Sequence, residues 1–268
     1  MASDPADPPR TVVVGGGVAG LSAALFTARA GLPTRVVSAG EPILARNAHL
    51  ENYPGFPAGI NARLLLEMTR DQVEAAGAAF VDGTAVDVTP VDDDSEDEMR
   101  PDGDGGSNGD DGTAFTVSLE DGRELSADSV VAASWSDAAY LDDLDLGLID
   151  RGSKRYVDVD EFGRSAVDGI YAAGRLAGTY HQAIVAAGHG ATVGRTVVED
   201  SDVPFYNDWV APEGYFTGRG REVPPGCEEI DEAEWQRRAE RSAETMREYF
   251  EDPAVEPPTM HPSVDHDE

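Results

Sequence analysis

Residues 10–38, RTVVVGGGVAGLSAALFTARAGLPTRVVS, decide the fold of this chain. A β-branched run ends in glycines, an Ala- and Leu-rich stretch without proline continues to Ala30, and Thr34 to Ser38 forms a second apolar run. This order predicts a strand, a tight turn, a helix and a second strand. A helix that connects two strands in this way places them parallel in one sheet. We therefore expect a doubly wound α/β fold.

The glycines at the first turn have the spacing of a dinucleotide-binding fingerprint, after a strand and before a helix. Gly15 permits the tight turn, Gly17 lets the main chain approach a pyrophosphate, and Gly20 lets the helix pack closely on the strand. The helix begins at Val18 and Ala19, where unpaired N–H groups and the positive end of the helix dipole are available to phosphate. The sequence therefore predicts a nucleotide site here.

The position that usually carries an acid for the adenosine ribose lies about 20 residues further on and falls on Ser38. A serine hydroxyl still bonds a ribose hydroxyl, with about half the strength of a charge-assisted hydrogen bond. Ser38 is therefore expected to weaken nucleotide binding without changing which nucleotide binds. It does not separate FAD from NAD.

Downstream of this unit, helices continue to alternate with short strands. Asp121-Gly122 favours a hairpin turn, where positive φ is needed, and the small residues of the last helix require a close packing partner. The expected elements are a helix over 62–76, a strand over 79–88, a hairpin over 113–126, strands over 129–133, 155–159 and 169–173, and a helix over 182–199. The core domain is expected to run from 10 to 200.

Three segments differ in composition from this core. Residues 1–9 are a polar, Pro-rich lead that we expect to be flexible. Residues 91–112 form an acidic, Gly-rich insertion that we expect to be disordered, because it has almost no apolar residues to bury. Residues 201–268 are an irregular extension with an amphipathic helix over about 231–250. The apolar stripe of that helix is expected to pack on the core rather than to hold a cofactor or partner.

Composition excludes several classes of function. The chain has 20 basic and 52 acidic residues, a net charge of −32 that repels nucleic acid and anionic membranes. We interpret this charge as an adaptation to a high-salt cytoplasm, and the alternative is an acidic surface that docks basic partners. No apolar signal core and no run of about 18 apolar residues is present, so we expect a cytoplasmic protein.

Cysteine content and residue spacing leave few catalytic options. Cys227 is the only cysteine, so one chain cannot form a disulfide, a dithiol relay or a Cys-rich metal site. No Ser/His/Asp or metal-ligand spacing is present. We interpret His49, His181 and His189 as ordinary polar residues, and we assign neither a catalytic residue nor a metal.

Three stretches together resemble the low-molecular-weight thioredoxin reductase family. They are GGGVAGLSAA from Gly15, LENYPGF from Leu50, and GIYAAG from Gly169 with YHQAIVAAGHG from Tyr180, in the family's order and spacing over residues 10–200. The resemblance implies a Rossmann-like FAD-binding fold, in which a β-hairpin or meander crossover joins the parallel sheet. It also implies FAD as the cofactor.

The same resemblance assigns further residues to the cofactor. Asn52 and its turn would lie near the flavin and ribityl chain, and Gln182 and Ala183 would begin the helix that faces the flavin pyrimidine. A helix N-terminus in that place stabilises the negative charge of a reduced flavin. Gly174 precedes Arg175, which stands where the family has an Asp on a ribityl hydroxyl. Arg175 either grips the pyrophosphate or indicates a site that no longer holds FAD.

Other departures limit what the resemblance implies about activity. Between Ser134 and Arg155 the family inserts an entire second dinucleotide domain, where this chain has about twenty residues. We therefore expect neither an NADPH domain nor a Cys-x-x-Cys pair, and thioredoxin reduction is not implied. Trp135 also stands where the family has glycine, and the segment from Glu41 lacks an amide expected near the flavin.

Two functions stay open on the sequence. The first is a FAD-dependent oxidoreductase whose electron donor and acceptor, small molecules or redox proteins, reach the flavin from outside the chain. The alternative is a non-catalytic FAD- or nucleotide-binding module, which Ser134, Trp135 and Arg175 favour. The sequence names neither donor nor acceptor, and a homodimer stays open as the oligomeric state.

Overall fold

The computed structural model describes residues 8–91, 115–152, 154–251, 258 and 260. The flexible lead, the disordered acidic insertion and the last part of the extension, all expected from the sequence, lie almost entirely outside these residues. Within the described residues, no helix has both the length and the apolar composition that a bilayer span requires.

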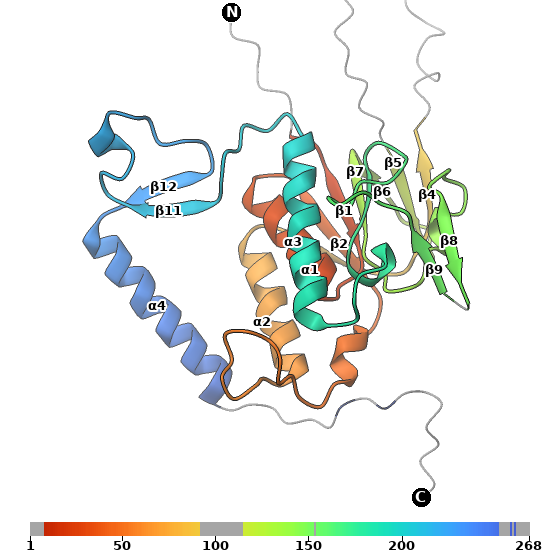
Figure 1. Ribbon diagram of the computed structural model, residues 1–268, viewed down its shortest axis with the longest axis horizontal. Helices are drawn as coiled ribbons and strands as arrows, with labels where there is room; N and C mark the ends of the chain where they lie inside the picture. The colour runs from red at the N-terminus through yellow and green to blue at the C-terminus, as the bar shows by residue number, and fades with distance from the viewer. Residues whose placement is uncertain (1–7, 92–114, 153, 252–257, 259, 261–268) are drawn as a thin grey trace, which may run out of the picture.

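A five-stranded parallel sheet forms the centre of the molecule, with strand order β10-β7-β1-β2-β3 (Figure 1). Its strands are β1 (Thr11–Val14), β2 (Thr34–Ser38), β3 (Ala79–Asp82), β7 (Ser129–Ala132) and β10 (Ile170–Ala172). β1 is paired on both sides, with Val14 opposite Val37 and Ala132, and it is buried along its whole length. A central parallel strand is covered on both faces, which explains its continuous apolar run. The α/β fold predicted from the sequence is confirmed.

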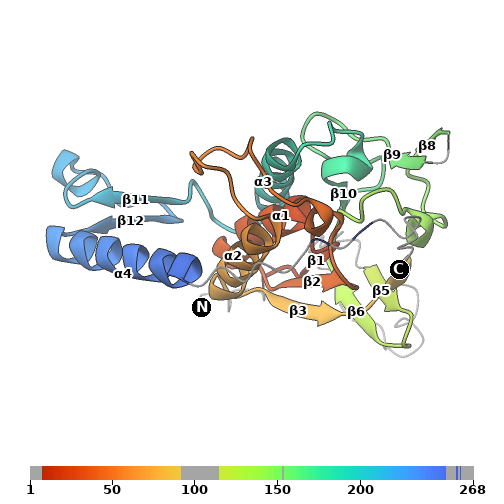
Figure 2. The same ribbon diagram turned by 90° about the horizontal axis from the view of Figure 1, so that it is seen from below.

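Helices cover one face of this sheet (Figures 1 and 2). They are α1 (Val18–Arg29), α2 (Ala62–Ala75) and α3 (Ala183–Asp200). Their buried residues pack with Val13, Val36 and Val131 from that face in one core cluster. Asn61 begins α2, where its side-chain oxygen accepts a hydrogen bond from the Arg63 N–H at 2.9 Å.

α1 and α3 approach each other closely because glycines of α3 face α1. A Cβ added to Gly190 would lie 2.0 Å from the carbonyl oxygen of Ala19, and a Cβ on Gly194 would lie 2.5 Å from that of Ala23. Only glycine fits these positions without separating the two helices. The small residues of the 182–199 segment predict a close packing partner, and α1 is that partner.

The opposite face of the sheet carries an antiparallel meander. Its strands are β4 (Ala85–Pro90), β5 (Phe115–Leu119) and β6 (Glu124–Ala127). Phe115 and Val117 pack with Val12 and Val37 of the parallel sheet in a second core cluster. The prediction of one strand over 79–88 is wrong, because the chain divides near Gly83 into β3, which joins the parallel sheet, and β4, which joins the meander.

Shorter elements complete the body. β8 (Leu148–Arg151) and β9 (Lys154–Val157) form an antiparallel hairpin, of which the sequence predicts only the second strand. Short 3-10 helices are η1 (Ile43–Arg46), η4 (Ala139–Leu141), η5 (Gly174–Ala177) and η6 (Thr217–Arg219). Residues of η1 and η5 line the main cavity of the molecule.

The segment after α3 folds into a small unit at the side of the body (Figure 1). β11 (Trp209–Pro212) and β12 (Cys227–Ile230) pair in parallel, and α4 (Glu232–Glu251) follows them. Arg29 forms an ion pair with Asp208, and the Tyr249 hydroxyl donates to Asp71 at 2.6 Å. Both ends of this C-terminal unit are therefore tied to the body by polar contacts.

Glu229 organises the loop between β11 and β12. Its carboxylate accepts hydrogen bonds from the N–H groups of Gly214, Phe216 and Thr217 and from the Thr217 hydroxyl. Burial alone would raise the pKa of Glu229, but these hydrogen bonds outweigh it and lower the pKa to about 2. The carboxylate is therefore ionised at neutral pH and holds the loop as an acceptor.

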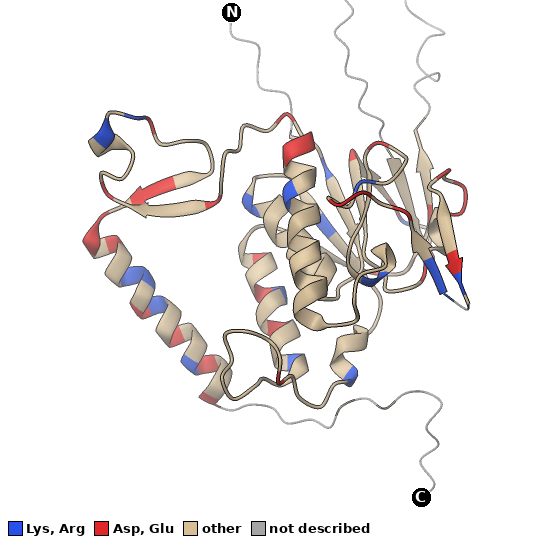
Figure 3. Cartoon of the chain, viewed as in Figure 1, with Lys and Arg blue, Asp and Glu red and all other residues tan. Residues whose placement is uncertain are grey.

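α4 does not pack on the core, so the role predicted for its apolar stripe is wrong. No residue of α4 is buried, and Trp235 and Phe250 are 59% and 45% exposed. Figure 3 shows acidic and basic residues interspersed along the helix. Arg238 pairs with Glu228 and, one turn away, with Glu234. Ion pairs between residues one turn apart, such as Arg238 and Glu234, stabilise a helix that has no buried face.

Candidate functional site

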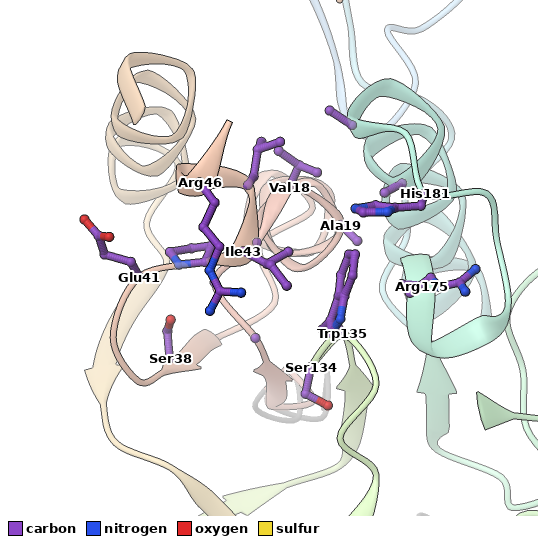
Figure 4. Close-up of a pocket in the computed structure, with 18 of the residues that line it drawn as sticks. Val18, Ala19, Ser38, Glu41, Ile43, Arg46, Ser134, Trp135, Arg175 and His181 are labelled. Atoms are coloured by element: carbon purple, nitrogen blue, oxygen red, sulfur yellow. The ribbon is translucent and has the colours of Figure 1, made fainter. Parts of the chain in front are cut away.

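A cavity of about 970 Å³ opens at the carboxyl ends of β1, β2 and β7 (Figure 4). From β1 the sheet extends through β2 and β3 on one side and through β7 and β10 on the other, so the cavity lies where the strand order reverses. Open α/β sheets bind their ligands at such a switch point. The volume is at the upper end of the range of about 300–1,000 Å³ found for small-molecule sites.

The first turn of α1 presents backbone N–H groups to this cavity. Gly17 is the N-cap, no side chain caps the helix, and no acid lies in its first turn. The first backbone bond of the helix runs from the Leu21 N–H to the Gly17 oxygen. The N–H groups of Val18 and Ala19 therefore have no intrahelical partner, and both residues line the cavity.

Each fingerprint glycine has its own structural reason. Gly15 has φ 122°, and a Cβ there would lie 2.4 Å from the Ala133 oxygen. A Cβ on Gly20 would lie 1.9 Å from the Gly15 oxygen, so the fold itself requires both of these glycines. A Cβ on Gly17 would meet no protein atom within 4 Å. At this cavity-lining position, the missing side chain leaves room for a ligand.

A second helix N-terminus without a side-chain cap belongs to α3. Gln182 is its N-cap, and no acid lies in the first turn. Asn52 Nδ2 donates to Gln182 Oε1 at 2.7 Å, which ties the 50–60 loop to the start of the helix. Ala183 and Ala186 line the cavity beside them. The structure thus brings the predicted residues Asn52, Gln182 and Ala183 together.

Gly174 and Arg175 lie between β10 and α3. The Gly174 N–H donates to His189 Nδ1 at 3.0 Å, which requires a neutral imidazole, and burial lowers the pKa of His189 in the same sense. Arg175 lines the cavity and donates to the Thr179 carbonyl at 3.1 Å and to the Tyr156 hydroxyl at 2.8 Å. Its Nε is buried without a partner among the described residues. The Nε–H of the guanidinium therefore stays uncommitted, and the predicted phosphate contact stays a prediction.

Two family models match the chain around this site. One described as an FAD binding domain matches residues 10–49, and one described as a pyridine nucleotide-disulphide oxidoreductase matches residues 98–190. A thioredoxin reductase of Aquifex aeolicus is 39% identical over 77 residues, which cover 28% of this chain and 24% of that protein. One of Rickettsia bellii is 30% identical over 136 residues, 49% of this chain and 37% of that protein. The chain is thioredoxin-reductase-like.

Solved structures share this thioredoxin-reductase-like fold. The atypical thioredoxin reductase of Desulfovibrio vulgaris gives a TM-score of 0.53 at 20% identity, covering 72% of this chain and 97% of that one. The thioredoxin reductase of Streptococcus pyogenes gives 0.59 at 14% identity with the same coverage. The chain spans between 24% and 37% of the length of the two curated relatives named above. The likeness therefore describes the fold, and the relatives' activity is not carried over with it.

The site of this thioredoxin-reductase-like chain fits FAD as its cofactor. The unpaired amides at Val18 and Ala19, with no acid in their turn, suit a pyrophosphate. The N-terminus of α3, also without an acid, suits a ring edge that gains negative charge. The FAD-binding match covers the first of these two segments. Among the described residues, no group of three or more His, Cys, Asp or Glu side chains is arranged to hold a metal ion.

Sequence reasoning missed part of the cavity wall on the β2 side. Ser38, Glu41 and Arg46 line the cavity there (Figure 4). Ser38 is predicted to contact the ligand, Glu41 is named only as a departure from the family, and Arg46 is not predicted. A Cβ on Gly16 would lie 2.5 Å from Ser38 Oγ, so this hydroxyl sits against the glycine turn. Glu41 and Arg46 belong to the loop and short helix after β2. Their position directly behind the ribose-binding residue of the fingerprint is the signal that could have found them.

The residues that follow β7 form another part of the wall, where the sequence names Ser134 and Trp135 only as departures from the family. Ser134 Oγ donates to the Asp137 carbonyl at 2.5 Å and contacts the Tyr140 hydroxyl at 2.9 Å. Burial raises the pKa of Tyr140, which keeps its hydroxyl protonated. Trp135 has φ 65°, and its ring centroid lies 4.5 Å from that of His181, with the planes at 72°. Trp135 is the only non-glycine residue with positive φ in the described part of the chain.

Proposed function

We propose that this protein is a FAD-dependent oxidoreductase that exchanges electrons with a donor and an acceptor from outside the chain. The observation that carries this proposal is the pair of helix N-termini, of α1 and α3, that open onto one cavity without a side-chain cap or an acid in the first turn. One N-terminus suits a diphosphate and the other suits a redox-active ring. A site for a mononucleotide needs only the first.

The roles of the residues follow from this arrangement. When bound, FAD supplies the electron-transfer chemistry. The amides of Val18 and Ala19 hold the diphosphate, and Gly17 leaves the space for it. The start of α3, held in place by the Asn52–Gln182 hydrogen bond, favours the more negative redox state of the ligand through its dipole and free N–H groups.

Features of the chain support an external donor and acceptor. Cys227 is the single cysteine of the sequence, and it lies in the C-terminal unit rather than at the cavity. About twenty residues join Ser134 to Arg155, and they form η4, β8 and the start of β9. We therefore propose that the chain holds neither an NADPH domain nor a dithiol, and that small molecules or redox proteins serve as partners. A cytoplasmic location and a high-salt setting stay predictions.

The alternative function is a non-catalytic FAD- or nucleotide-binding module. Two observations favour it: the Arg175 guanidinium is engaged by Tyr156 and Thr179, and Trp135 narrows the site beside α3. Reduction of the bound flavin separates the two functions. The oxidoreductase is expected to bleach readily with dithionite or on photoreduction and slowly with NADPH. A flavin that cannot be reduced supports the module, and fast, saturable reduction by NADPH contradicts the proposed absence of an NADPH site.

A pair of glycine substitutions tests FAD binding itself. A Cβ meets no protein atom within 4 Å at either Gly17 or Gly188, but only Gly17 lines the cavity. Gly17 also has φ −81°, which alanine adopts freely. We expect Gly17→Ala to fold normally and to bind FAD at least about tenfold more weakly, a loss of about 1.4 kcal/mol, because the methyl group takes the diphosphate's space.

The measurement is a titration of apo-protein with FAD, followed by flavin fluorescence in molar salt, with Gly188→Ala as the matched control. Gly188→Ala is expected to bind FAD as the parent does. Parent protein that takes up no FAD under these conditions overturns the proposal. If the Gly17→Ala variant and the parent bind FAD with equal affinity, the diphosphate does not bind at the N-terminus of α1.

A further inference from the structure

Trp135 and His181 stand at the end of the cavity that is opposite Ser38. Figure 4 shows Ser38 and Glu41 on the β2 side and Trp135 and His181 toward α3. In a dinucleotide fold, the residue after the second strand lies at the adenosine ribose. The amides of α1 lie between the two ends, at the place of the diphosphate. The second ring system of a dinucleotide therefore belongs at the end where Trp135 and His181 stand.

The backbone holds Trp135 in a conformation that only glycine adopts readily. Its φ of 65° is disfavoured for a bulky aromatic residue. The residues around it keep it there: the Ala133 N–H donates to the Val14 oxygen at 2.8 Å, and Ser134 is held by Asp137 and Tyr140. Such strained residues gather at ligand sites, where the surrounding structure enforces them. The strain at Trp135 directs its indole to the cavity, which it lines.

His181 steadies the indole without covering both of its faces. The two rings meet edge-on, at 4.5 Å between centroids and 72° between planes. An edge-on contact leaves at least one face of the indole free of the imidazole. Trp135 is half-buried and His181 is exposed, so the pair stands at the mouth of the cavity rather than in the core.

We propose that Trp135, steadied by His181, stacks on the isoalloxazine ring of bound FAD and closes one face of it. This inference rests on the proposed function, because it requires FAD in the cavity. Aromatic rings gain from offset stacking beyond the area that they bury. A covered face also means that the donor and the acceptor reach the flavin from its other face or from its edge. Trp135 is thus a positioning residue that decides access to the flavin.

Time-resolved flavin fluorescence tests this contact directly. Tryptophan in van der Waals contact with a flavin quenches its fluorescence by electron transfer, and phenylalanine does not. We expect the reconstituted parent protein to have a dominant, strongly shortened lifetime that Trp135→Phe removes. FAD affinity is expected to fall by up to about threefold in Trp135→Phe, because phenylalanine still stacks but with a smaller ring. The matched control is Trp209→Phe, since Trp209 packs on Tyr215 and Phe216 in the C-terminal unit.

A second variant separates cofactor contact from a structural role. Trp135→Gly relieves the φ of 65°, so its apo-protein is expected to melt no lower than the parent while it binds FAD more weakly. If the parent binds FAD but Trp135→Phe changes neither lifetime nor affinity, the stacking proposal fails and the proposed function stands. A Trp135→Gly apo-protein that melts far below the parent, with unchanged FAD affinity, shows a structural role and also overturns it. A parent that binds no FAD contradicts the proposed function instead.

Discussion

Arg175 lines the cavity, with two guanidinium nitrogens bonded to Tyr156 and Thr179 and its Nε uncommitted. A charge-assisted hydrogen bond contributes about 1.5–3 kcal/mol, so we expect Arg175→Ala to bind FAD about tenfold to over a hundredfold more weakly. Arg175→Asp is expected to be no better, because it sets a carboxylate near phosphate. Titration of each apo-protein with FAD at one fixed high salt concentration measures the affinities under equal screening.

The control for this prediction keeps the Arg175 guanidinium and removes one of its hydrogen-bond acceptors. Tyr156→Phe deletes the hydroxyl that accepts from Arg175 and leaves the guanidinium in place. It is expected to bind FAD within about fivefold of the parent, since less than about 1 kcal/mol is at stake for an exchangeable neutral partner. If Arg175→Asp binds FAD more tightly than the parent, then arginine at this position weakens the FAD site. That result would favour the non-catalytic module.

The sequence predicts backbone requirements at single residues better than side-chain partners. Gly15 and Gly20 are predictable because the turn and the helix–strand contact they serve lie within one βαβ unit. The support of Arg175 by Tyr156 is not predictable, because the two residues are 19 positions apart and belong to different elements. Trp135 shows the same limit. The sequence shows that it replaces the family's glycine, but not where its side chain points.

The loop between β11 and β12 depends on a single ionised carboxylate. The pKa of Glu229 is lowered from its ordinary value of 4.5 to about 2, so its contribution to stability is complete above pH 4.5 and is lost as the pH falls through about 2. We expect Glu229→Gln to be less stable than the parent at pH 7, with a difference that shrinks between pH 4.5 and 2. Near-ultraviolet circular dichroism of the packed Trp209, Tyr215 and Phe216 rings follows this loop during urea unfolding.

The neighbouring acid provides the control for Glu229. Glu228 pairs only with Arg238 among the described contacts and accepts no backbone hydrogen bond. Glu228→Gln is therefore expected to leave the loop signal of the parent unchanged across this pH range. A Glu229→Gln deficit that stays constant from pH 7 to pH 2 would mean that the lost charge is not its cause.

Elements with a local signal are predicted well, and those that depend on distant partners are not. α4 begins after Asp231, whose side chain accepts from the Glu234 N–H at 2.8 Å, and the predicted helix starts at about the same residue. Its exposure is not predictable, because periodicity shows that a helix has an apolar face but not what covers that face. β11 and β12 are missed for a related reason: each has four residues, and their pairing depends on a loop closed by Glu229.

Across the whole molecule, the net charge of −32 is the feature that salt should affect most. The screening length falls from about 10 Å at 0.1 M to about 3 Å at 1 M salt, which weakens repulsion among the excess carboxylates. We expect the melting temperature to rise by roughly 4–8 °C between 0.1 M and 2 M KCl, which corresponds to about 2 kcal/mol for a domain of this size. Differential scanning calorimetry measures the shift.

A non-ionic solute distinguishes screening from general exclusion effects. Sucrose at matched osmolality stabilises folded proteins without screening charge, and it is expected to give a clearly smaller rise than KCl. An equal rise in sucrose, or no rise in KCl, would contradict the interpretation of the acidic surface as an adaptation to high salt. It would favour the alternative, in which these acids dock a basic partner.

The close contact between α1 and α3 fixes the position of one helix relative to the other. Because Gly190 and Gly194 lie directly against Ala19 and Ala23, neither helix can slide or tilt without opening the interface. The uncapped N-termini of the two helices are therefore held at a fixed separation. A ligand that contacts both N-termini must fit this fixed separation.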